Sequence, residues 1–227
     1  HEEPIRDGLP VHADAPVIPG VLVRHEVGDP VRRVSYLLNR HVPAFENALF
    51  ANPRDPRALF YLAGTYDAIA RTFDFLAMDA RARGGGEQAD GIEDQARTYA
   101  ATGMSLYLRL GSVTSDPDLA VHARYRALDL AIRAELHEPR EILLRLAAFL
   151  RETPECAEAK VLRLQVLAAV LPREVASYKI HLLAALEAAE VSRRAQGRVA
   201  FLPAGGECLW RSYLVAAQAA LSLGRED

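Results

Sequence analysis

Apolar residues recur every three to four positions along most of the chain after residue 29. After Pro56, for example, Leu59, Leu62 and Tyr66 fall on one side of a helix with 3.6 residues per turn. Because the connections between such segments are mostly short, we expect consecutive helices to pack as antiparallel hairpins. The pattern predicts helices at residues 30–51, 56–70, 72–83, 92–110, 117–137, 139–151, 155–171, 173–194 and 207–223.

Most of the predicted helices begin with one signature, a capping or acidic residue followed by proline. Proline suits the first turn of a helix, where its missing N–H would have no partner. A preceding aspartate or threonine can accept hydrogen bonds from the free N–H groups of that turn. Pro43 lies inside the first helix and is expected to kink or split it. The signature occurs at Asp29-Pro30, Asp55-Pro56, Asp116-Pro117, Glu138-Pro139 and Thr153-Pro154.

The first 29 residues differ from the rest of the chain. They hold four prolines and three glycines, which favour an extended segment over a helix. Residues 17–23 are rich in β-branched side chains and predict one short strand. A second interruption, Gly84-Gly85-Gly86 with the polar residues after it, is expected to be a flexible connection. The sequence therefore predicts an extended lead-in at 1–29 and an all-α domain at 30–227.

One helix carries a repeat signature. Leu59, Leu62-Ala63 and Tyr66 occur in the order and spacing of the first helix of a tetratricopeptide (TPR) repeat. In that interpretation residues 56–70 and 72–83 form the two helices of one hairpin, although bulky Phe75 stands where a small residue is usual. We expect a TPR-like superhelical array, whose concave face comes mainly from the first helix of each hairpin.

Composition narrows the classes of function. The chain has 227 residues, half of them hydrophobic and a quarter charged, with a net charge of −3. This balance is typical of a globular protein and argues against a nucleic-acid partner. The sequence has no apolar run of transmembrane length and no signal peptide, so we expect a cytoplasmic protein. Because the chain starts at a histidine, we expect it to be part of a longer protein.

Three segments together resemble a known family. They are NPRDPRALFYLAGTY (52–66), the pair Gly84-Gly85, and WRSYLVAAQAALSLGR (210–225). Their combination is similar to the TPR-like helical region that follows the catalytic domain in some bacterial family 2 glycosyltransferases, in which a His-Glu pair such as His1-Glu2 closes the catalytic domain. The resemblance implies that the catalytic domain lies upstream and uses a nucleotide-sugar donor and a divalent metal. It implies no cofactor in this chain, except that His1 would match a histidine that contacts metal or diphosphate; a residual tag histidine is the alternative.

Candidate binding residues lie off the apolar stripes. Arg57 and Tyr61 form one set, and Arg211 and Tyr213 form a second set on the last helix. Arginine and tyrosine are enriched at binding hot spots. We predict no catalytic residue. The string Asp116-Pro117-Asp118 matches a metal-binding Asp-x-Asp loop, but its place at a helix start favours capping.

Three functions are compatible with these observations. The favoured one is a non-catalytic helical domain of a glycosyltransferase that binds a protein or a glycosyl acceptor, or forms a homo-oligomer. The alternative is a free-standing TPR-like adaptor that binds a protein or peptide. The third is a small enzyme with a metal site at His12, Asp14 and His25, which lack the spacing of a zinc motif. Four further histidines are expected in capping or surface roles: His41, His122, His137 and His181.

Overall fold

The computed structural model describes residues 5–6, 9–10, 29–171, 175–194 and 205–223. Within these residues the chain is helical, apart from a short antiparallel pair of strands, β1 (Ile5–Arg6) and β2 (Leu9–Pro10). The strand expected at 17–23 lies outside the described residues. The helices are α1 (Pro30–Tyr36), η1 (Leu37–His41), α2 (Val42–Ala51), α3 (Pro56–Ala82), α4 (Gly86–Val113), α5 (Pro117–Arg133), α6 (Pro139–Glu152), α7 (Ala157–Val170), α8 (Val175–Arg194) and α9 (Gly205–Leu223).

The aspartate-proline signatures begin helices as predicted. Asp29, Asp55 and Asp116 each accept a hydrogen bond of 2.9–3.0 Å from the backbone N–H two residues later. Asp116 therefore acts as a cap, as expected. Thr153 does not cap a helix, because its hydroxyl donates to the Phe149 carbonyl oxygen at 2.7 Å. It closes α6, and α7 begins only at Ala157.

The first helix changes form next to Pro43, where we expected a kink or a split. The five residues before Val42 form the π-helical turn η1, and the Val42 N–H donates to the Leu37 carbonyl oxygen, five residues back. Proline has no N–H with which to continue the α-helical ladder, so a local widening of the helix next to it has a clear cause. The elements α1, η1 and α2 follow one another without a break, so Pro43 does not split the helical segment.

The predicted hairpin at 56–83 is wrong. Residues 56–82 form one helix of 27 residues, α3, which pairs with the 28-residue α4. No glycine or proline interrupts the chain between Gly64 and Gly84, so nothing stops the helix at residue 71. The flexible connection expected at 84–91 is also wrong, since Gly84 and Gly85 make a tight turn and α4 starts at Gly86.

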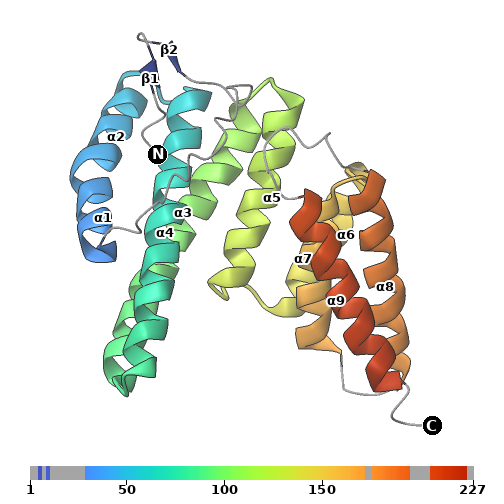
Figure 1. The fold of residues 1–227 in the computed structure, drawn as a ribbon. Coiled ribbons are helices and arrows are strands. Elements are labelled where there is room, and N and C mark those ends of the chain that lie inside the picture. Colours follow the sequence, from blue (N-terminus) through green and yellow to red (C-terminus); the bar gives the residue numbers. More distant parts are fainter. Residues whose placement is uncertain (1–4, 7–8, 11–28, 172–174, 195–204, 224–227) are drawn as a thin grey trace.

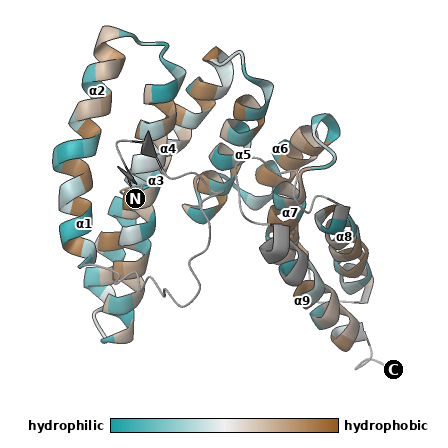
Figure 2. Ribbon diagram, turned by 45° about the horizontal axis from the view of Figure 1, so that its top comes forward, coloured by the Kyte–Doolittle hydropathy of each residue, from teal (hydrophilic) through white to brown (hydrophobic). Residues whose placement is uncertain are grey.

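The helices form an arch, with the α3–α4 hairpin as one limb and α8 and α9 as the other (Figure 1). Hydrophobic and hydrophilic residues alternate around each helix (Figure 2), so every helix has a face to bury. Helices two apart in sequence also touch: α1 contacts α3, α5 contacts α7, and α7 contacts α9. Ion pairs join α3 to α5. The odd-numbered helices therefore make a continuous row.

A candidate binding groove and a buried ion cluster

A cluster of charged side chains lies where α3, α4 and α5 meet. Its centre is Asp67 on α3, whose side chain is only 6% exposed. The Asp67 carboxylate pairs with Arg126 and Arg133 of α5, and with Arg71 of its own helix at 3.1 Å. Asp129 of α5 adds a second carboxylate, 3.0 Å from the Arg126 guanidinium. A buried carboxylate with this many donors is satisfied, and it fixes the position of α5 on α3.

Two residues of α4, Gly103 and Tyr107, help to bury the ion cluster. A Cβ atom on Gly103 of α4 would lie 3.4 Å from the Ala63 carbonyl oxygen and 3.3 Å from the Leu130 side chain, so glycine permits close approach there. Tyr107 of α4 shares a hydrogen bond with Arg126. Burial lowers the pKa of Arg126, but the carboxylates of Asp67 and Asp129 outweigh that effect and leave the pKa above its ordinary value. The guanidinium therefore stays charged.

His122, for which we expected a capping or surface role, lies half-buried beside this cluster. Its ring centroid is 5.7 Å from that of Phe60 and 6.3 Å from that of Tyr107. Burial, with a smaller contribution from the Arg126 charge, lowers the pKa of His122 to about 4. The imidazole is therefore neutral at physiological pH.

Arg57 and Tyr61, the first predicted binding set, lie at the surface but are not isolated. Tyr61 is 45% exposed, and its ring stacks on Phe45 of α2 with centroids 5.4 Å apart. The Arg57 guanidinium lies 5.8 Å from the Tyr61 ring centroid. These two residues therefore help to hold α2 on α3, and replacing both is expected to cost stability.

A groove of about 660 Å³ opens between α7, α8 and α9. One complete face of α7 and one complete face of α9 line it, at the spacing of successive helical turns. Its volume falls within the range of ligand sites in proteins, about 300–1,000 Å³. The apolar part of the lining includes Val161, Leu164, Leu171, Leu214, Val215 and Ala219, and the polar part includes Gln165, Tyr178, His181, Arg211, Gln218 and Ser222.

The polar lining carries one buried atom without a partner. The Nε2 atom of His181 is buried and makes no hydrogen bond within the described part of the protein. Arg211 lines the same groove, and no carboxylate does so among the described lining residues. An unsatisfied buried polar atom costs about 1–3 kcal/mol. Four other buried side-chain atoms of the described residues share this state outside the groove: Arg124 Nε, Arg133 Nε, His137 Nε2 and Glu158 Oε1.

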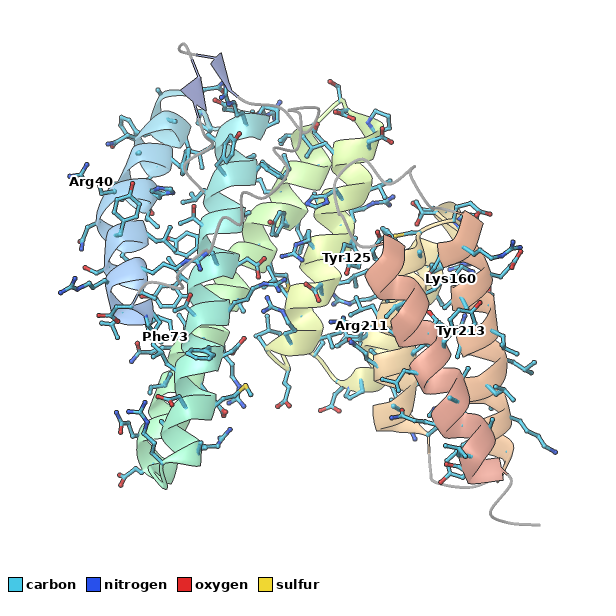
Figure 3. All side chains as sticks on the ribbon, viewed as in Figure 1. Arg40, Phe73, Tyr125, Lys160, Arg211 and Tyr213 are labelled. Carbon is cyan, nitrogen blue, oxygen red and sulfur yellow. The ribbon has the colours of Figure 1, made fainter. Side chains whose placement is uncertain are left out.

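The predicted binding residues do not form one site. Arg57 and Tyr61 are on α3, and α9 lies in the other limb of the arch (Figure 1). Arg211 and Tyr213 project from opposite sides of α9 (Figure 3), because two residues turn a helix by about 200°. Of these four residues, only Arg211 lines the groove. His1, His12, Asp14 and His25 lie outside the described residues.

Sequence reasoning missed the ion cluster and most of the groove. A signal for the cluster exists, because Asp67 lies four residues after Ala63 and three before Ala70, on a buried face of its helix. A charge at such a position needs a partner from another helix. The groove has a weaker signal: Arg211, Leu214, Gln218 and Ser222 share one helical face that is neither wholly apolar nor wholly polar.

Comparison with protein-family models, curated proteins and solved structures found no match for this chain. Across the described residues, no helix combines the length and hydrophobicity needed to cross a membrane. The same residues contain no cluster of three or more side chains suited to hold a metal ion. The groove between α7, α8 and α9 is the candidate site on which the proposed function rests.

Proposed function

We propose that this chain is a TPR-like helical-repeat domain that binds a protein or peptide partner, as a non-catalytic part of a cytoplasmic bacterial glycosyltransferase. The observation that carries the binding role is the groove between α7 and α9. In helical-repeat arrays the first helix of each hairpin lines the concave, ligand-binding face. The contacts of α5 with α7 and of α7 with α9 are those expected between first helices of successive hairpins.

The lengths of the hairpins support the same proposal for the C-terminal part. The α5–α6 hairpin spans residues 117–152 and the α7–α8 hairpin spans residues 157–194, close to the 34-residue period of TPR repeats. The α3–α4 hairpin spans residues 56–113 and is far longer. On this proposal the longer hairpin is a supporting element, and binding belongs to the regular part of the array.

The glycosyltransferase part of the proposal is supported by the resemblance at 52–66 and 210–225. In that setting the partner is the catalytic domain, a second copy or a protein that carries the glycosyl acceptor, and the nucleotide-sugar and divalent metal are held outside this chain. The coding sequence upstream of His1 tests this part. An in-frame domain with an Asp-x-Asp motif supports it, and an in-frame stop codon there leaves the free-standing adaptor instead.

Leu214 provides the test of the binding role. It lines the groove and is 48% exposed, so Leu214→Glu introduces a charge into the groove without disturbing a buried core. Leu183 of α8 is a matched control, because it is 69% exposed and does not line the groove. We expect partners cross-linked to the tagged protein in cells to be lost with Leu214→Glu and retained with Leu183→Glu. Equal recovery with both variants would place binding elsewhere.

A further inference from the structure

One face of α3 is left uncovered by the described helices that surround it. The helices α1, η1 and α2 pack on one side of α3, α4 packs on another, and ion pairs join it to α5 (Figure 1). The uncovered positions are spaced alternately by four and three residues, which is the heptad spacing of helices that pair along their length. We call this face the α3 seam, and all its residues are exposed or half-buried: Arg57, Tyr61, Gly64, Ala68, Arg71, Phe75, Met78 and Ala82.

The large apolar side chains at the outer end of the α3–α4 hairpin lie on the seam and not in the hairpin interior. Phe75 and Met78 are 58% and 69% exposed, whereas the buried residues of this end are the alanines at 77, 89 and 96. Burial of a large apolar side chain contributes more to stability than burial of an alanine methyl group. This arrangement therefore favours a partner that covers the seam.

Gly64, in the middle of the seam, is not required by packing within the chain. A Cβ atom there would meet only the Tyr107 hydroxyl oxygen among the described residues, at an ordinary contact distance of 3.7 Å. Gly103 differs, because its Cβ atom would lie 3.3 Å from the Leu130 side chain. Glycine inside a helix is destabilising relative to alanine. Its presence on the seam favours close approach by a side chain from outside the chain.

The seam is complementary in size to a second, antiparallel copy of itself. About a two-fold axis between residues 69 and 70, Phe75 lies opposite Gly64 of the second copy, and Tyr61 lies opposite Met78. The largest side chain thus faces the smallest, as close packing of two helices requires. In a parallel pair, Phe75 would face Phe75 and Gly64 would face Gly64, which separates the helices at one level and leaves a gap at another.

The charges at the two ends of the α3–α4 hairpin favour the same antiparallel order. The inner end, residues 52–61 and 105–113, holds three arginines and one aspartate, a net charge of +2. The outer end, residues 79–96, holds five acidic residues and two arginines, a net charge of −3. An antiparallel pair brings each positive end beside a negative one, whereas a parallel pair brings like charges together.

The charged side chain in the middle of the seam is compatible with this pairing. The Arg71 guanidinium lies 3.1 Å from the Asp67 carboxylate and 3.4 Å from the Asp129 carboxylate of α5. Its charge is therefore directed toward the ion cluster. The aliphatic part of the side chain is left to pack against Ala68 of the second copy.

We propose that two copies of this chain pair antiparallel through the α3 seam. This inference goes beyond the proposed function, because it uses the limb of the arch that does not hold the groove. The two can fail independently, since Leu214→Glu in the groove should leave the dimer intact, and a charge in the seam should leave partner binding at the groove intact.

Sedimentation equilibrium of the full chain at micromolar concentration is the first test, and we expect twice the mass of one chain. Phe75→Glu and Met78→Glu each place a charge in the seam and should weaken the dimer at least tenfold. Leu144→Glu is the matched control, because Leu144 of α6 is 73% exposed and lies off the seam. Circular dichroism confirms that each variant is folded. A monomeric wild type, or an equal loss in the control, would overturn the proposal.

Cysteine cross-linking tests the antiparallel order without adding charge. Chains with Gly64→Cys are mixed with chains with Phe75→Cys and oxidised. We expect a cross-linked dimer from the mixture and none from either variant alone, because residue 75 lies about 16 Å along the helix from its own counterpart in an antiparallel pair. The wild type controls for cross-links through its native cysteines, Cys156 and Cys208. A cross-link formed by Phe75→Cys chains alone would indicate parallel order and contradict the proposal.

Gly64→Ala separates pairing from folding. Alanine suits a helix interior better than glycine, so at a dilution where both proteins are monomeric the variant should melt about 2–4 °C higher than the wild type. Its dimer should be about tenfold weaker, because the added methyl group occupies the space that Phe75 of the second copy needs. Pairing as strong as that of the wild type would show that this glycine does not serve the seam, and the proposed register would be wrong.

Discussion

The two limbs of the arch differ in the buried polar groups that they hold. Around α3–α5, the carboxylate of Asp67 has arginine partners from two helices, and its side chain is almost fully buried. Around α7–α9, the Nε2 atom of His181 is buried without a partner within the described residues. The ion cluster also has a buried atom without a hydrogen-bond partner, the Nε atom of Arg133. The limbs therefore differ in the number of buried ion pairs that join their helices, and not in the presence of an unsatisfied atom. Under the proposed function, the first limb is the support and the second limb binds the partner.

A difference in ion pairing supports this division. The α7–α8 pair of Lys160 and Glu187 also joins two helices, but its acid is 53% exposed. Solvent reaches this pair only from the Glu187 side, because the Lys160 side chain is 10% exposed. The pair therefore contributes more than the about 0–1 kcal/mol of a fully exposed pair. Asp67 joins α3 to α5 through an ion pair with Arg126 that is almost fully buried. The packing of α5 on α3 therefore depends on Asp67 more strongly than the packing of α8 on α7 depends on Glu187.

The largest predicted effect is that of removing the charge of Asp67. Asp67→Asn leaves Arg126, itself mostly buried, without its main counter-charge. Breaking a buried ion pair in this way costs about 3–5 kcal/mol of unfolding free energy. Urea denaturation followed by circular dichroism measures the loss.

Glu187→Gln is the matched control in the other limb. Because Glu187 is half exposed while Lys160 is buried, its loss is expected to cost about 1–2 kcal/mol, less than the loss of Asp67. Equal losses for the two variants would show that the ion cluster does not distinguish the limbs.

The positions of most helices follow from local sequence, but the length of α3 does not. Asp29, Asp55 and Asp116 cap their helices through bonds that span two residues, so a local pattern is enough to predict them. The apparent repeat at 56–83 was misleading because the periodicity of apolar residues continues unchanged through a helix and gives no stop at residue 71. The hydroxyls of Thr65 and Thr72 bond back to carbonyl oxygens of their own helix, which suits a continuous α3.

The candidate site depends on tertiary structure that no single segment encodes. Arg211 was predicted to bind, yet its relation to His181 arises only when α9 packs beside α7 and α8. The partners of Asp67 lie 59 and 66 residues away in sequence. Tyr61 was placed at the surface correctly, but its stacking on Phe45 needed the position of α2. Residue type and helical face were predictable, and pairing across helices was not.

Acid is predicted to destabilise the limb that holds the ion cluster. In the folded protein the pKa of His122 is about 4, below the 6.5 of an unperturbed histidine. Between these values the unfolded chain binds the extra proton, so stability falls as the pH drops from about 6.5 to 4. The full shift corresponds to ~3 kcal/mol, which partial exposure of the ring reduces to roughly 1–2 kcal/mol. Unfolding free energies at pH 4.5 and 7 measure it.

His122→Phe isolates this contribution. Burial raises the pKa of nearby Asp74 despite the opposing charge of Arg133, and that shift acts in the opposite direction, stabilising the fold as the pH falls. The informative quantity is therefore the difference in pH dependence between the wild type and His122→Phe. If the variant keeps the full acid sensitivity of the wild type, the sensitivity arises elsewhere than beside the ion cluster.

The smallest predicted effect compares the turns that close two hairpins. Gly84 after α3 and Glu135 after α5 both have positive φ, 85° and 51°, and both turns close with the same pair of backbone hydrogen bonds. Glycine adopts this conformation freely, whereas a residue with a side chain loses about 1–2 kcal/mol of folding stability there. Glu135 gains little in return, since its contact with Arg97 at 3.6 Å is exposed.

Glu135→Gly should therefore raise the unfolding free energy by about 1 kcal/mol, and Gly84→Ala should lower it by a similar amount. Thermal denaturation would show shifts of about 2–4 °C in opposite directions for a chain of this length. A loss of stability in Glu135→Gly would mean that the Arg97 contact outweighs the strain, and that the α5–α6 turn is held by charge while the α3–α4 turn is held by glycine.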